Sequence, residues 1–296
     1  MEVGDFTDLE IFMSVHATRV VASGLSFTEC PRWHDGLLWF SDMGAPRRVA
    51  TIDPTGHIET VVHVPNAPGG LGFLDDGSLL VVSMEDRRLL RFDQGRLEEV
   101  ADLSGIATWH ANDLVVDVLG RAYVSNFGFD FLGGAPPIDA TLAVVAPSGE
   151  VSAVADGIEF ANGMVITPDG RTLIVAETLG GRLTAFDRAP DGALSGRRIF
   201  CELPDFSPDG ICLDAEGAVW AGSIFHSEFV RVLEGGEVTD RVPVPGKWAV
   251  ACMLGGRQRT TLYLCTVATS MAEMLEGKSE GFIETTEVAV PGAGLP

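Results

Sequence analysis

Four polar residues open short apolar runs at equivalent points of a repeated phrase: Glu29, Asn112, Asn162 and Asp209. Each stands seven or eight positions before a turn glycine, at the open end of an otherwise apolar strand. Such groups cost free energy when buried unless something binds them. Carboxylate and amide oxygens are ligands that hard divalent cations prefer, and a cation there would polarise a carbonyl oxygen and lower the pKa of bound water.

The alternative for these four residues is structural. A single Asn or Asp at a strand end most often caps a turn or bonds neighbouring backbone. Four such residues in register are harder to explain in this way, so the pattern favours a metal site. The elements that carry them must then bring their first residues together.

The repeated phrase has a polar opening, a short strand, an Asp-Gly or Pro-Asp-Gly turn and a second strand, and it is clearest in residues 161–175. Its turn glycines are 41, 43, 50 and 47 residues apart, at Gly36, Gly77, Gly120, Gly170 and Gly217. A degraded sixth copy spans residues 248–256. This period, with four short strands per unit, predicts an all-β fold: a six-bladed β-propeller with four-stranded blades.

Propeller topology decides which residues can meet. The hairpin turns lie on the far face, while the first residues of the innermost strands and the loops after the second strands surround the mouth of the channel. The last blade lacks an outer strand, and residues 17–23, ATRVVAS, are expected to supply it. Closing the ring in this way removes the open sheet edges.

No linker or charge block divides the chain, so residues 1–296 are expected to form one propeller domain, with residues 1–16 and 291–296 as peripheral tails. Twenty basic against 42 acidic residues give a net charge of −22. That balance argues against nucleic acid or an anionic membrane as partner, and it is compatible with a bound cation or simply with solubility. The oligomeric state is left open.

Residues 1–12, MEVGDFTDLEIF, are acidic where a signal peptide needs basic residues, and no later stretch approaches the ~20 apolar residues of a membrane span. A cytoplasmic location is therefore expected. The five cysteines include no C-x-x-C pair, which makes zinc-finger and redox sites weak hypotheses. Buried thiols are the expectation.

Four segments carry a family resemblance: SFTECPRWHDGLLWFSD, HANDLVVDVLGRAYVS, FANGMVITPDGRTLIVAE and SPDGICLDAEGAVWAGS. They resemble the signature segments of the senescence marker protein (regucalcin), gluconolactonase and luciferin-regenerating enzyme family, over about residues 27–267. The resemblance implies a six-bladed propeller that hydrolyses lactones with one divalent metal at its mouth. It implies Glu29, Asn162 and Asp209 as metal ligands, Asp209 also as general base, and Asn112 as a contact to substrate or metal-bound water. Oxygen ligands favour Ca²⁺, and Zn²⁺, Mn²⁺ or Mg²⁺ could occupy such a site.

This chain departs from the sugar lactonases at His110, where those members tend to have an arginine. Asp130 could match the acidic residue of their following loop. Losing the arginine removes a forked donor suited to polyhydroxylated substrates. The loops expected at the mouth are apolar, and Phe127 and Trp248 there could pack the loops or line a pocket. In a pocket they predict a substrate less polar than a simple aldonolactone, with His226 as a secondary contact.

The resulting hypothesis is hydrolysis of a lactone or related ester, in which the metal polarises the carbonyl and Asp209 helps deprotonate water. His110 could orient or protonate the leaving oxygen, or be an ordinary pocket residue. The chain has no G-x-S-x-G, H-E-x-x-H, P-loop or dinucleotide-binding motif. Two alternatives stay open: a non-catalytic metal-binding scaffold, and a different acyl or ring-opening reaction at the same metal site.

Overall fold

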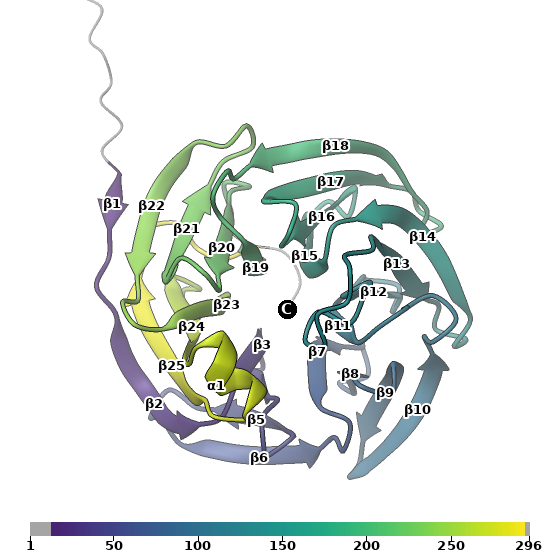
Figure 1. Cartoon of the computed structure of the whole chain (residues 1–296), viewed down its shortest axis with the longest axis horizontal. Helices are drawn as coiled ribbons and strands as arrows, with labels where there is room; N and C mark the ends of the chain where they lie inside the picture. The colour runs from purple at the N-terminus through teal and green to yellow at the C-terminus, as the bar shows by residue number, and fades with distance from the viewer. Residues whose placement is uncertain (1–12, 294–296) are drawn as a thin grey trace, which may run out of the picture.

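A ring of six four-stranded antiparallel sheets surrounds a central channel in the computed structural model, which describes residues 13–293 (Figure 1). The prediction of an all-β, six-bladed propeller is confirmed. From the innermost strand outward, the first three blades consist of β3 (Thr28–His34), β4 (Leu37–Asp42), β5 (Arg48–Ile52) and β6 (Ile58–His63); β7 (Pro68–Phe73), β8 (Leu79–Ser83), β9 (Arg88–Asp93) and β10 (Arg96–Asp102); and β11 (Ala111–Val116), β12 (Ala122–Asn126), β13 (Ala140–Val145) and β14 (Val151–Ile158).

The remaining three blades follow the same order, and the last is completed from the start of the chain. They consist of β15 (Ala161–Ile166), β16 (Thr172–Glu177), β17 (Arg182–Arg188) and β18 (Leu194–Glu202); β19 (Pro208–Leu213), β20 (Val219–Ser223), β21 (Glu228–Val232) and β22 (Val238–Pro243); and β23 (Trp248–Gly255), β24 (Thr261–Ala268), β25 (Glu280–Glu287) and β2 (Arg19–Leu25). A short helix, α1 (Met271–Leu275), connects β24 to β25.

The N-terminal strand closes the ring as predicted. β2 runs antiparallel to β25, with Arg19 opposite Thr285. Before it, β1 (Ser14–Val15) pairs in parallel with β22 at the outer edge of the fifth blade. Of the expected tails, residues 1–12 and 294–296 lie outside the described residues. Near the C-terminus, the last described residues return to the fifth blade, where the backbone N–H of Ala293 donates to the Leu213 carbonyl at 2.9 Å.

The second strands are mostly buried on both faces, because neighbouring blades pack against them from either side. β8, β12 and β20 contain only buried residues. Between the second and third blades the contact is made by side chains such as Leu80, Leu114 and Val124. Each fully buried side chain of this size contributes about 1.5–3 kcal/mol. The apolar runs in the sequence therefore reflect burial between blades.

Aspartates and glycines shape the hairpin turns that join the first two strands. In the fourth blade, Gly170 adopts a φ of +69°, which favours glycine, and the Asp169 carboxylate accepts the N–H of Arg171 at 3.0 Å. In the fifth blade Asp214, three positions before Gly217, accepts the N–H of Glu216 at 2.9 Å, and Gly217 adopts a φ of +82°. All five cysteines are buried free thiols, as expected. None of the helices within residues 13–293 is long and apolar enough to cross a membrane.

Candidate active site

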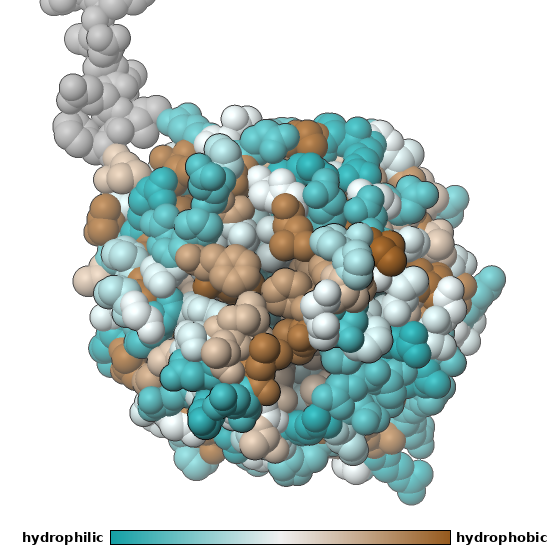
Figure 2. Space-filling model, viewed as in Figure 1, coloured by the Kyte–Doolittle hydropathy of each residue, from teal (hydrophilic) through white to brown (hydrophobic). Residues whose placement is uncertain are grey.

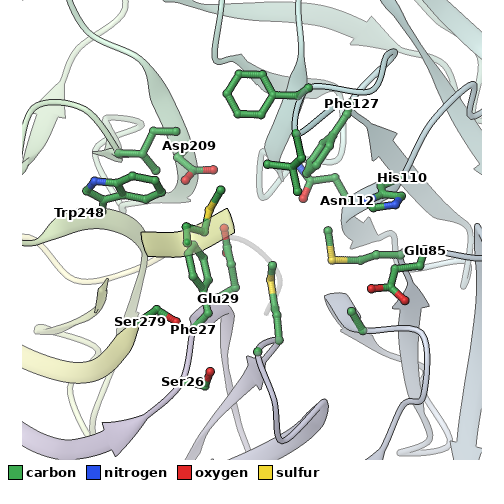
Figure 3. Close-up of a pocket in the computed structure, with 18 of the residues that line it drawn as sticks. Ser26, Phe27, Glu29, Glu85, His110, Asn112, Phe127, Asp209, Trp248 and Ser279 are labelled. Carbon is green, nitrogen blue, oxygen red and sulfur yellow. The ribbon is translucent and has the colours of Figure 1, made fainter. Parts of the chain in front are cut away.

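The innermost strand of every blade carries an irregularity near its start. There the register with the second strand shifts, between Glu29 and Arg32, Pro68 and Leu71, Ala111 and Leu114, Ala161 and Met164, Pro208 and Ile211, and Ala249 and Ala251. Such bulges leave a residue out of the ladder and re-aim its side chain. In four blades they carry Glu29, Asn112, Asn162 and Asp209, which line one cavity of about 470 Å³ at the mouth of the channel (Figure 3).

Blades two and six place no carboxylate or amide at this point, for two different reasons. In blade two, Gly69 and Gly70 lie against the backbone of β11, and a Cβ on Gly70 would come within 2.2 Å of the Leu114 nitrogen. In blade six the bulge is formed by apolar residues next to Trp248, whose ring lines the cavity. The polar groups therefore come from blades one, three, four and five.

Both carboxylates of the site are buried. Glu29 is 6% exposed and Asp209 is 4% exposed. Burial, reinforced by the charge of Asp113, raises the pKa of Glu29 to about 7. Burial and the Glu29 carboxylate together raise the pKa of Asp209 well above its usual range. The site therefore disfavours two negative charges unless a cation accompanies them.

The arginine nearest to these carboxylates is already paired. Arg32 reaches from β3 to β11, where its Nη2 donates to Asp113 Oδ1 and to the Leu114 carbonyl, both at 2.7 Å. In full ionisation Glu29, Asp113 and Asp209 carry three negative charges, and Arg32 carries one positive charge. Three minus one leaves two negative charges, which is the charge that one divalent cation would balance.

The two asparagines complete an oxygen-rich donor set. Asn162 Nδ2 donates to Thr178 Oγ1 at 3.1 Å, and Asn112 Nδ2 donates to the Ala161 carbonyl at 3.3 Å. Their amide nitrogens are thus engaged with the protein, which leaves the amide oxygens available as ligands. No group of three His, Cys, Asp or Glu side chains that could hold a metal occurs in residues 13–293. Two carboxylates with amide oxygens fit a hard cation such as Ca²⁺.

The walls of the cavity are mostly apolar, and brown hydrophobic residues surround the hollow in Figure 2. They come from all around the ring and include Phe27, Met43, Met84, Phe127, Phe131, Phe160, Ile224, Trp248, Met271 and Met274. Phe127 both lines the cavity and stacks on Phe160, with ring centroids 4.6 Å apart. The aromatic residues therefore pack the loops together and also form the pocket.

His110 lines the cavity together with Asn112 (Figure 3). Its ring stacks on Trp109, with centroids 5.2 Å apart, and lies 6.0 Å from the ring of Phe127. Burial lowers the pKa of His110, against the opposing charges of Glu85 and Asp130. The imidazole is consequently neutral near pH 7 and can both donate and accept a hydrogen bond.

Two of the residues singled out in the sequence lie outside the cavity lining. The Asp130 carboxylate turns back to its own loop and accepts the N–H of Gly133 at 2.7 Å. His226 bonds Ser223 Oγ through Nδ1 at 2.8 Å and stacks on Phe206. The structure thus brings together Glu29, Asn112, Asn162, Asp209, His110, Phe127 and Trp248, but not these two.

Sequence reasoning missed the helix at the mouth. The connection after β24 places Met271, Met274 and Ser279 in the cavity lining. A local signal was available, because Ser270 and Glu273 form a capping box that begins α1. Ser-x-x-Glu is nevertheless a short pattern, and it does not reveal that the helix would line the cavity at the mouth.

Comparisons with known proteins agree with this fold and show the family. A family model described as an SMP-30/Gluconolactonase/LRE-like region matches residues 27–268. A 6-deoxy-6-sulfogluconolactonase of Pseudomonas putida is 25% identical over 279 residues, which cover 90% of this chain and 93% of the relative.

Two solved structures share the fold. A luciferin-regenerating enzyme aligns with a TM-score of 0.80 at 16% identity, over 95% of this chain and 98% of that chain. A calcium-binding protein, regucalcin, from Agrobacterium tumefaciens aligns with a TM-score of 0.74 at 20% identity, over 96% of this chain and 100% of that chain. At these identities the structural likeness concerns the fold alone.

Proposed function

The chain belongs to the SMP-30/gluconolactonase/LRE-like family, and we propose that it is a metal-dependent hydrolase that opens a lactone less polar than a simple aldonolactone. The observation that carries the proposal is the pairing of two buried carboxylates, which have no cationic partner among the described residues, with a mostly apolar cavity above them. The relative from Pseudomonas putida, itself a lactonase, supports the reaction class.

Glu29, Asn162 and Asp209 are the residues that would hold the metal. Ca²⁺ matches their oxygen donors best, and the calcium-binding regucalcin from Agrobacterium tumefaciens is consistent with that choice. Mg²⁺, Mn²⁺ and Zn²⁺ are the alternatives. When bound, a divalent ion polarises a carbonyl oxygen and lowers the pKa of water.

The protein groups supply the proton transfers and the orientation. Asp209, whose pKa is raised by burial and by Glu29, is the general base that accepts a proton as water adds to the lactone carbonyl. The ring C–O bond then breaks, and the leaving oxygen, which accepts a hydrogen bond from the neutral imidazole of His110, takes up the proton that Asp209 accepted. Asn112 contacts the substrate or the attacking water. The product is the open hydroxy acid.

The apolar walls set the expected substrate polarity. An arginine that would bind a polyhydroxylated ring is replaced by His110, whose pKa is lowered by burial. Arg47, which also lines the cavity, is bound to Glu85 at 2.7 Å and 2.9 Å. Apolar contact around the ring would exclude water and favour alkyl- or aryl-substituted lactones over sugar lactones.

The test is a pH-indicator hydrolysis screen across sugar lactones, alkyl-substituted lactones and aryl esters. Metal-stripped protein would be reloaded separately with Ca²⁺, Mg²⁺, Mn²⁺ and Zn²⁺. We expect metal-dependent acid release, with higher kcat/KM for apolar than for hydroxylated rings. Tight binding of a metal without turnover of any substrate would instead favour a scaffold or a different reaction at the metal site.

A further inference from the structure

The segment between β24 and β25, residues 269–279, lies at the mouth of the channel and contains α1 (Figure 1). Its two ends are held by the ladder between those strands, in which Ala268 pairs with Glu280. The other connections that line the cavity contribute no α-helix within residues 13–293. This segment is therefore an addition to the blade pattern, and it forms part of the wall of the candidate active site.

Hydrogen bonds hold the segment to itself. Thr269 Oγ1 donates to the Lys278 carbonyl at 2.9 Å and closes its base. The Lys278 N–H donates to the Glu273 carbonyl at 2.8 Å, and Ser270 caps the helix. Within the described part of the chain, every recorded hydrogen bond and ion pair of residues 269–279 stays inside the segment. Among residues 13–293, no hydrogen bond or ion pair fixes the segment to another blade.

Two methionines make its contact with the cavity. Met271 and Met274 are three residues apart and so lie on the same face of α1. Both are half-buried and line the cavity, whereas Ala272, Glu273 and Leu275 on the other faces are exposed. The side chain of Leu275 is 57% exposed. The helix therefore directs two thioether side chains into the cavity, while its leucine, Leu275, stays exposed.

These methionines complete the apolar wall above the carboxylates. Met43 and Met84 line the same cavity from blades one and two. Methionine side chains are flexible and polarizable, and they adapt to apolar groups of different shape. The cavity of about 470 Å³ lies within the roughly 300–1,000 Å³ of sites that enclose drug-sized ligands, which leaves room for a substituent beside a lactone ring.

We infer that residues 269–279 form a lid and that Met271 and Met274 are specificity-determining residues, which contact an uncharged alkyl or aryl substituent on the lactone. The inference rests on the proposed function for the identity of the reacting group. The methionines touch the substituent and take no part in the chemistry at the carbonyl. The lid thereby selects lactones by the length and polarity of their substituent.

The experiment compares a pair of variants on the same helix. Met271→Ser/Met274→Ser removes both thioethers from the cavity, and Ala272→Ser/Leu275→Ser makes equally polar changes on the exposed faces. Metal-loaded proteins are assayed on γ-lactones whose alkyl substituent grows from hydrogen to octyl. Binding of the corresponding alkyl lactams, which resist hydrolysis, is measured by calorimetry.

For the wild type and the control pair we expect kcat/KM to rise with chain length. In Met271→Ser/Met274→Ser, kcat/KM for the octyl lactone should fall about tenfold, mainly through KM, while the unsubstituted ring changes less than about twofold. Lactam affinities should follow the same pattern. Unchanged chain-length dependence in the methionine variant, or an equal loss in the control pair, would overturn the inference.

The two proposals can fail separately. Absence of turnover on every lactone, with lactam binding that still depends on chain length and on the methionines, contradicts hydrolysis and supports the lid. Turnover and binding that are indifferent to chain length in the wild type support hydrolysis and contradict the lid.

Discussion

Asp117 on the far face and the two carboxylates that line the cavity are all buried, and the protein treats them in opposite ways. On the far face, Asp117 is 5% exposed and accepts the Arg121 Nε–H at 2.6 Å and the Leu119 N–H at 2.8 Å. Arg188 also donates to it. Burial alone would raise the pKa of Asp117, but these hydrogen bonds outweigh burial and lower it. At the mouth, burial raises the pKa of both Glu29 and Asp209.

Glu177 ends β16 opposite Ala161, at the mouth end of its blade, but it receives donors as Asp117 does. It is fully buried, and Arg182, Arg197 and Thr184 all donate to its carboxylate. These contacts lower the pKa of Glu177 in spite of its burial. Burial alone therefore does not decide whether the pKa of a carboxylate is raised or lowered in this fold. The number of hydrogen-bond donors around the carboxylate decides it. Structural carboxylates receive arginines at either end of the blades, whereas Glu29 and Asp209 have no arginine ion pair among the described residues, which suits the proposed metal site.

The largest effect should come from removing one of the mouth carboxylates. Asp209→Asn keeps the size of the side chain but removes both a metal ligand and the proposed base. We expect kcat/KM to fall by about 10³-fold or more, with weakened metal binding. Indicator assays and calorimetric metal titrations would measure both. Asp117→Asn serves as the control and should leave both quantities nearly unchanged.

Retention of full metal affinity and activity by Asp209→Asn would refute the assignment of this carboxylate. Loss of metal binding in Asp117→Asn as well would show that the two ends of the blades are not independent, and the comparison between them would fail.

The same two substitutions should rank in the opposite order in their effect on the free energy of unfolding. Asp117→Asn breaks a buried ion pair and leaves arginine charge uncompensated, so we expect the free energy of unfolding to fall by about 3 kcal/mol. In metal-free protein, Asp209→Asn removes an unpaired buried acid and should be neutral or stabilising. Urea unfolding followed by tryptophan fluorescence would measure both. Equal destabilisation by the two variants would contradict the distinction between paired and unpaired carboxylates.

The smallest effect concerns the pH dependence of metal-free protein. The pKa of Glu29 is raised to about 7 in the folded chain, above its value in the unfolded chain. Between these values the folded chain holds a proton that the unfolded chain has lost, so the free energy of unfolding falls as pH rises. A loss of about 2–3 kcal/mol between pH 5 and pH 8 is expected.

Thermal unfolding of metal-free wild type and Glu29→Gln across this range would measure the effect. The variant should lose much of the slope, while saturating Ca²⁺ should stabilise the wild type most at the higher pH. Asp117 has a lowered pKa, so its contribution is present at neutral pH and is lost only in acid. A wild-type slope that survives unchanged in Glu29→Gln would contradict the role given to burial.

Much of this molecule could be predicted from local sequence. Turn aspartates and glycines such as Asp169 and Gly170 specify hairpins through contacts within a few residues, and their spacing predicts the blades. Closure by β2 followed from a strand that lacked any other partner. Asn162 and Asp209 could be selected because they occupy equivalent places in a repeat, and a repeat places equivalent residues at equivalent points of the ring.

The misplaced residues are those whose orientation depends on a loop. Asp130 and His226 were expected at the mouth because of their sequence neighbourhood, but each bonds within its own connection. A loop has no repeating ladder to fix which way a side chain points. The same reason explains why the place of Met271 and Met274 over the cavity could not be anticipated.

The sequence by itself determined the strand order, the turns and the set of polar residues that open the inner strands, because these depend on short-range propensity and on a repeated period. Tertiary structure alone decided their chemical environment. Arg32 and Asp113 are separated by 81 positions in the chain and meet only when the ring places blades one and three on either side of blade two. That contact pairs Arg32 with Asp113, so Glu29 and Asp209 have no ion pair with it. Such pairing depends on distances between charges, and only the closed ring establishes them.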